Sequence, residues 1–173
     1  MGAGRAPGIG LVKLIAARQG RTDKLDQLRC LRRDGSATST MMPRQGILPH
    51  DLLHYVVEST LGWRHGFLGM IEAGADIGWT MAQTHDPAAQ GVADQAIHAE
   101  AVVESLQAQL WSDAFDDSLF LDGVRSACAA RGRSVPVLPP HVGQTLFEAA
   151  LALNARWQAV PPHVTLELEL TGL

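Results

Sequence analysis

Residues 49–58, P-H-D-L-L-H-Y-V-V-E, combine histidines and acids at a spacing that suits metal chemistry. On a helix, His50, His54 and Glu58 recur every four residues and form a slightly slanted column on one face. Two imidazoles at positions i and i+4 can both reach one divalent ion, as in the H-x-x-x-H motif of zinc hydrolases. The segment therefore predicts a site for a divalent metal, with zinc as the first candidate.

Each polar residue of this segment has a predicted role. In zinc hydrolases the residue after the first histidine is a glutamate that acts as general base on metal-bound water, and here it is Asp51. We expect Asp51 to be the catalytic base or to orient a ligand. His50, His54 and Glu58 are the predicted metal ligands. Because Glu58 lies about 12 Å along the helix from His50, one ion cannot easily bind all three. Either His54 pairs with Glu58, or His50 and His54 bind the ion with a third ligand from elsewhere.

Other acids and histidines could supply that third ligand, and the sequence does not choose among them. They are Glu72, Asp76, His85, His98 (with Asp94 one turn before it) and His141. At about 100° per residue, the polar column lies at the edge of the helix's apolar stripe. We therefore expect a site that is partly desolvated but still reachable from solvent.

The same residues also allow a structural interpretation. Pro49 and Asp51 suit the first turn of any helix, and two histidines four apart match H-x-x-x-H wherever they occur. The sequence thus leaves two functions open. One is a metal-dependent hydrolase that acts on a small-molecule substrate. The other is a non-catalytic interaction protein, a homodimer, in which these residues form a structural hydrogen-bond network.

Strands are predicted at both ends of the chain. Residues 9–17, 25–32 and 37–42 are short apolar or Thr/Ser-rich runs, and Asp34-Gly35 between the last two is a strong hairpin signal. Residues 163–170 alternate strictly between apolar and polar side chains, which is typical of a strand with one buried face. We expect this C-terminal strand to join the N-terminal ones.

Helices are predicted for the middle of the chain: 49–61 (ended by Gly62), 66–75, 88–111, 117–131 and 140–157. Residues 83–90 and 133–139 are predicted loops. The fold class is therefore a single α+β domain over residues 1–173. Its small antiparallel sheet, of about four strands, packs against about five helices.

Composition excludes several classes of protein. The 173-residue chain has a formal net charge of −4, so it lacks the basic excess that binding to nucleic acid requires. No apolar run is long enough to cross a membrane, and a cytoplasmic protein is expected. Charge is uneven, however: residues 1–65 hold ten Lys and Arg against five Asp and Glu. We expect the basic part to pack beside the acidic remainder or to meet a second copy in a dimer.

Residues 30–77 resemble a family of small uncharacterised bacterial proteins. Its members carry an H-D-L-x-H-[YF]-x-V-E segment, then G-F-x-G-x-x-x-x-G-x-D-I, after an R-x-D-G hairpin. Here these are the segments beginning at His50 and Gly66 and the hairpin Arg32-Arg33-Asp34-Gly35. The resemblance implies no established activity. A Trp commonly precedes the Asp of the second segment, where this chain has Ala75, so that part of the site is expected to differ.

Overall fold

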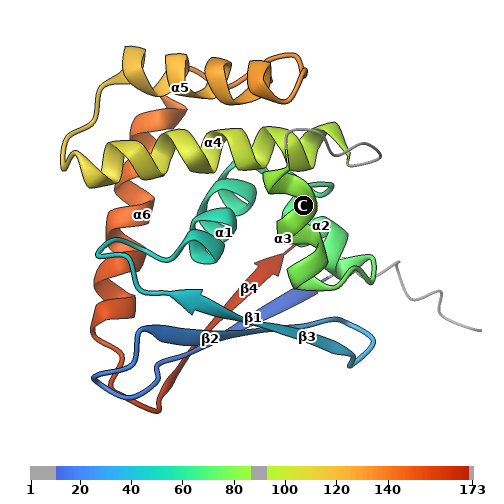
Figure 1. Ribbon diagram of the computed structural model, residues 1–173, viewed down its shortest axis with the longest axis vertical. Coiled ribbons are helices and arrows are strands. Elements are labelled where there is room, and N and C mark those ends of the chain that lie inside the picture. Colours follow the sequence, from blue (N-terminus) through green and yellow to red (C-terminus); the bar gives the residue numbers. More distant parts are fainter. Residues whose placement is uncertain (1–10, 87–92, 172–173) are drawn as a thin grey trace, which may run out of the picture.

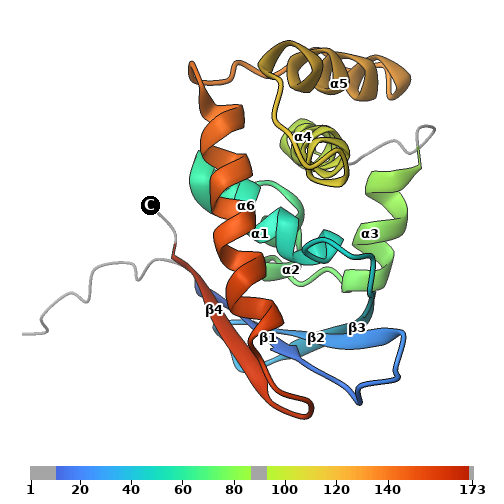
Figure 2. The same ribbon diagram turned by 90° about the vertical axis from the view of Figure 1, so that its left-hand side faces the viewer.

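The computed structural model describes residues 11–86 and 93–171, which form a sheet covered on one face by helices (Figures 1 and 2). The strands are β1 (Leu11–Ala17), β2 (Leu25–Leu31), β3 (Ala37–Pro43) and β4 (Thr165–Thr171). All neighbours pair antiparallel, in the order β3-β2-β1-β4. The predicted α+β class, with its N-terminal hairpin and C-terminal strand in one sheet, is confirmed.

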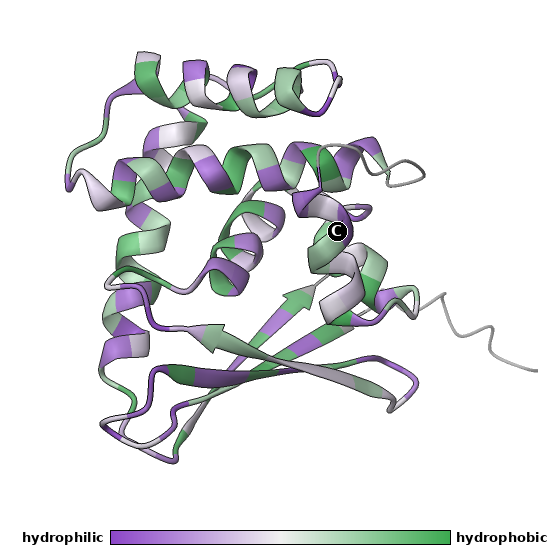
Figure 3. Ribbon diagram, viewed as in Figure 1, coloured by the Kyte–Doolittle hydropathy of each residue, from purple (hydrophilic) through white to green (hydrophobic). Residues whose placement is uncertain are grey.

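The alternation of side chains along β4 fixes which of its faces is buried. Leu168 is buried and lies opposite Leu14 of β1, whereas its neighbours Glu167 and Glu169 are exposed. The same alternation is visible along the strand in Figure 3. Because adjacent strand residues point to opposite faces, the leucines fill the core beneath the helices and the glutamates face solvent.

The helices are α1 (His50–Leu61), α2 (Phe67–Glu72), α3 (Ile77–His85), α4 (Asp94–Trp111), α5 (Asp117–Ala130) and α6 (Val142–Gln158). Among them α4 is central: it lies between α5 and α1 and packs against each of the other five (Figures 1 and 2). None of the helices in the described part of the chain is long and apolar enough to span a membrane.

One helix was not predicted from the sequence. Asp76 accepts a hydrogen bond from the backbone N–H of Trp79, and this cap begins α3. The predicted helix 66–75 is shorter, because Gly74, with φ of 111°, ends it. Residues 83–85 are therefore helical and not part of a loop. Residues 9–10 of the first predicted strand and 88–92 of the predicted helix 88–111 lie outside the described residues.

Asp26 of β2 joins three backbone segments at one end of the sheet. The carboxylate is fully buried and accepts hydrogen bonds from Arg44 Nε (2.9 Å), Arg44 Nη2 (2.7 Å) and the backbone N–H of Gln19 (2.8 Å). Arg18 adds a longer contact of 3.4 Å. Burial alone raises the pKa of Asp26, but these hydrogen bonds and positive charges outweigh burial and hold it below its ordinary value.

We expect Asp26→Asn to lower the free energy of unfolding near neutral pH by about 2 kcal/mol. The loss is smaller than for a fully buried ion pair because both arginines keep partial solvent exposure. A lowered pKa in the folded state stabilises the fold above the ordinary Asp pKa, and this contribution is lost as pH falls through the folded-state value. Urea unfolding should therefore show a difference between the two proteins that is constant from about pH 7 to about pH 5 and shrinks as pH falls below about 4. A difference that does not change with pH would contradict this account.

Candidate metal centre

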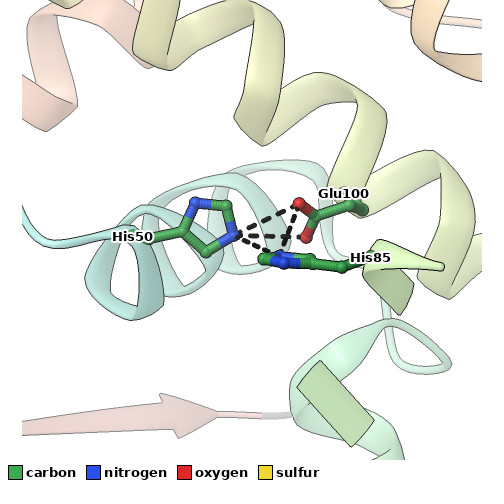
Figure 4. Close-up of side chains that lie close together, drawn as sticks. All are labelled: His50, His85 and Glu100. Carbon is green, nitrogen blue, oxygen red and sulfur yellow. Dashed lines mark hydrogen bonds and ion pairs between the residues drawn. The ribbon is translucent and has the colours of Figure 1, made fainter. Parts of the chain in front are cut away.

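Three side chains from three helices converge at one point (Figure 4). His50 is the first residue of α1, His85 the last of α3, and Glu100 lies in the second turn of α4. His50 Nε2 lies 3.2 Å from His85 Nε2 and 3.3 Å from Glu100 Oε1, and His85 Nε2 lies 2.9 Å from Glu100 Oε1. These atoms are close enough together to hold one metal ion, and we call the three residues the metal-capable group.

The spacing of the three atoms suits tetrahedral coordination. Zinc binds nitrogen and oxygen ligands at about 2.0–2.1 Å, which places tetrahedral ligand atoms about 3.3 Å from one another. Glu100 Oε1 is buried and has no hydrogen-bond partner despite its closeness to both rings. A buried carboxylate oxygen that accepts no hydrogen bond is costly. A cation at the centre of the three atoms would compensate that cost.

Two glutamines orient the ring of His50. Gln107, two turns after Glu100 on α4, donates from Nε2 to Gln45 Oε1 (2.9 Å), so its own Oε1 is directed at His50. His50 Nδ1 donates to that oxygen at 2.9 Å. With Nδ1 bonded to Gln107, Nε2 is the nitrogen that faces His85 and Glu100. Metal-binding histidines are oriented in the same way, by a hydrogen bond from the ring nitrogen that is not a ligand.

His54 orients the carboxylate of Glu100. It donates from Nε2 to Glu100 Oε2 (2.8 Å) and from Nδ1 to Glu58 Oε2 (3.2 Å). Burial disfavours the charged ring, but the two carboxylates outweigh burial and raise the pKa of His54 to about 10. His54 is therefore an imidazolium at neutral pH. Its contact with Oε2 leaves Oε1 as the oxygen of Glu100 that is free to bind an ion.

Glu58 is held in turn by the start of α2. Its Oε1 accepts the backbone N–H of Leu68 at 3.0 Å, and the ring of Phe67 lies against His54 with centroids 4.6 Å apart. Gly66 allows this close approach, because a Cβ at that position would lie 2.2 Å from Glu58 Oε1. Burial raises the pKa of Glu58, and the hydrogen bonds from His54 and Leu68 act in the opposite direction.

The charges of the cluster act on one another. Burial opposes ionisation of Glu100, but contacts with His50, His54 and His85 hold its pKa well below the ordinary value. The contact with Glu100 raises the pKa of His85. Asp51, directly after His50, is also buried; burial raises its pKa, and its Oδ1 has no hydrogen-bond partner. The described residues thus place three buried acids, Asp51, Glu58 and Glu100, around the histidines.

The sequence-predicted column divides into two environments. His50 and His85 keep exposed side-chain fractions of 18% and 48%, whereas His54 and Glu58 are at 0%. The expectation that the whole column is reachable from solvent is therefore wrong for His54 and Glu58. The reason is tertiary packing: α2 covers one side of His54 through Phe67, and α4 covers the other through Glu100. His54 and Glu58 lie beside the metal-capable group and not within it.

Of the proposed third ligands, only His85 lies in the group. Glu72 ends α2, and Asp76 caps α3 and accepts the Thr38 hydroxyl. His98 contacts the carbonyl of Ser134, and His141 lies directly before α6. Glu100 was missed. The sequence did contain a sign of its role. Glu100 lies between Ala99 and Ala101 on a helix whose apolar positions predict burial, and a buried acid needs a partner.

Comparisons of the chain with protein-family models, with curated proteins and with solved structures found no match. The resemblance of residues 30–77 to a bacterial family therefore stays an expectation, and the geometry of the site carries the functional argument.

We expect Gly66→Ala to lower the free energy of unfolding by about 1–3 kcal/mol, because the added methyl displaces Glu58 from Leu68 and His54. Gly78→Ala in α3 is the matched control: its Cβ would meet only the Asp76 carboxylate, at 3.2 Å, so a small change of either sign is expected. Chemical denaturation monitored by circular dichroism measures both. Equal effects of the two substitutions would show that Glu58 can move without cost.

Proposed function

We propose that the chain binds one divalent metal ion through His50 Nε2, His85 Nε2 and Glu100 Oε1. The observation that carries the proposal is the convergence of these atoms at 2.9–3.3 Å around a buried carboxylate oxygen that lacks a hydrogen-bond partner. The contacts of His50 with Gln107 and of Glu100 with His54 support it, because metal sites depend on hydrogen bonds that orient their ligands.

Zinc is the metal that this ligand set favours. Two histidines and one glutamate form the three-ligand set of several hydrolytic zinc enzymes, in which the fourth position holds water. A bound zinc ion lowers the pKa of that water to about 7 and so supplies a nucleophile at neutral pH. We therefore propose a metal-dependent hydrolase of a small-molecule substrate. His85, the more exposed ligand, lies on the side from which a substrate would approach.

Asp51 keeps its sequence-predicted role within this proposal. Its carboxylate is buried next to the first ligand, and its charge interacts with His50, His54 and Glu100. An acid oxygen without a partner at such a place can accept a hydrogen bond from water or a ligand. Whether Asp51 acts as base or as orienter stays a prediction.

The second candidate is a non-catalytic interaction protein, a homodimer, in which the same residues form a structural network. It is favoured by the complete hydrogen bonding of His54, whose two ring nitrogens both meet carboxylates. That network would stabilise the packing of α1 against α4 without any ion. Metal content separates the two candidates.

The purified chain should bind one zinc ion per molecule, measured by elemental analysis and by competition with a chromogenic chelator. Each of His50→Ala, His85→Ala and Glu100→Gln should remove stoichiometric metal. His54→Ala should weaken affinity about 10–100-fold, because Glu100 loses its orienting partner. His98→Ala is the control, since it removes a histidine of α4 that contacts the Ser134 carbonyl and the Trp63 ring and none of the three ligands.

Circular dichroism would establish that each variant is folded before its metal content is compared. A folded wild-type chain that takes up no zinc, cobalt or manganese would overturn the metal proposal and leave the structural network. Metal retained by all three ligand variants would place the ion elsewhere.

The zinc-loaded chain should hydrolyse at least one member of a panel of small activated esters, amides and phosphoesters. Turnover should disappear in Glu100→Gln and persist in His98→Ala, because only the first removes a ligand. Rates are measured against zinc in the same buffer. A chain that binds zinc at the three residues but hydrolyses no member of the panel would refute the hydrolase while the metal site stands.

A further inference from the structure

A basic cleft opens at the end of the sheet, apart from the metal-capable group. It consists of two cavities of about 390 and 190 Å³ that share Arg18, Arg44 and Gln158 in their walls. The larger is completed by Gln19, Arg21, Ala159, Val160, Pro161 and Pro162. The smaller is completed by Gln45, Gly46, Ile47, Pro49 and Trp157. Neither lining includes an acidic residue, and neither includes a member of the His50, His85 and Glu100 group.

We propose that this arginine cleft, defined by Arg18, Arg21 and Arg44, binds the phosphate group of a small phosphorylated molecule. The guanidinium is planar, permanently charged and suited to paired hydrogen bonds with phosphate oxygens. Three of them border a cavity whose volume lies in the range of small-molecule sites. A phosphate monoester carries nearly two negative charges. It therefore matches the positive charge of the arginines better than a single carboxylate does.

The charge of the cleft is not cancelled by its surroundings. Asp26 lies fully buried beneath it and pairs with Arg44 and Arg18, and the charge of Asp23 also acts on Arg44, so three guanidinium groups face two carboxylates. The carboxylate of Asp23, which lies two residues after Arg21, accepts a hydrogen bond from the backbone N–H of Gly20 at 2.7 Å. A net positive potential therefore remains at the cavity, where it attracts an anion.

Two of the arginines are held in place before any ligand arrives. Arg44 is fixed by Asp26 and by the backbone carbonyls of Gly20 (3.0 Å) and Arg21 (3.3 Å). The guanidinium of Arg18 lies 4.9 Å from the ring centre of Trp157, and its hydrogen bonds to Asp26 and Gln158 are long, at 3.4 and 3.3 Å. Such long bonds are weak, so the N–H groups of Arg18 remain available to a stronger acceptor.

The cleft also has an apolar side. Val160, Pro161 and Pro162 line the larger cavity together with the charged groups. A bare inorganic ion would not use this surface, whereas a phosphate ester with a small aromatic or aliphatic group would bury that group against it. The proposal gives three of the basic residues in the N-terminal part of the chain a function. It is independent of the metal site.

The test is calorimetric titration of the full chain with phenyl phosphate, after dialysis against phenanthroline to remove bound metal. We expect saturable binding of one molecule, tighter than that of inorganic phosphate or of benzoate. Arg21→Gln, an exposed substitution, and Arg18→Gln should each weaken binding at least tenfold. Arg29→Gln is the matched control, because Arg29 is an exposed arginine of β2 outside the cleft and should leave binding unchanged.

Absence of saturable binding at millimolar phenyl phosphate would overturn the proposal. An equal loss in Arg29→Gln and Arg21→Gln would also overturn it, because it would show attraction by overall charge and not by a site. Benzoate binding as tightly as phenyl phosphate would refute recognition of phosphate. Because metal is removed first, none of these outcomes depends on the metal proposal.

Discussion

The buried carboxylate of Glu100 is the constraint on which the functional half of this structure depends. α4 packs against every other helix, so a charged side chain in its second turn is removed from water. The free energy of burying an ionised carboxylate is prohibitive without compensating partners. Three histidines from two other helices supply them, and the arrangement of α1 and α3 around α4 is therefore an electrostatic requirement as well as a packing solution.

One side of α1 packs in the core, and the other side carries the histidines of the cluster. Leu52, Leu53, Val56 and Val57 are buried in the core, whereas His50 and His54 turn toward α4. Two series of hydrogen bonds then continue from these histidines to the segments before and after α1. One runs from His50 through Gln107 to Gln45, before the helix, and the other from His54 through Glu58 to Leu68, after it. The loop before α1 and the first turn of α2 after it thus fix the angle at which the α1 histidines meet Glu100.

Side-chain periodicity was sufficient to predict the sheet and most helices, because alternation and the helical repeat report burial along a single element. The strand ending at Thr171 and the helix starting at His50 are examples. α3 was missed because it is a short helix that depends on the Asp76 cap. Glu100 was missed for a different reason: periodicity places a residue on a face, but only tertiary packing decides which elements cover that face. His85 could be named as a candidate, yet not chosen, for the same reason.

The spacing of His50 and His54 is not sufficient for the two rings to bind one ion. Two rings one turn apart can share an ion only if both face open space, and here packing separates them. His50 stays at the rim with its Nε2 directed at His85 and Glu100, whereas His54 is enclosed between two carboxylates and carries a proton on each nitrogen. An imidazolium cannot bind a metal ion, but it can hold a carboxylate that is placed to bind one. The metal and network interpretations of the sequence therefore describe neighbouring halves of one cluster: His50 belongs to the first and His54 to the second.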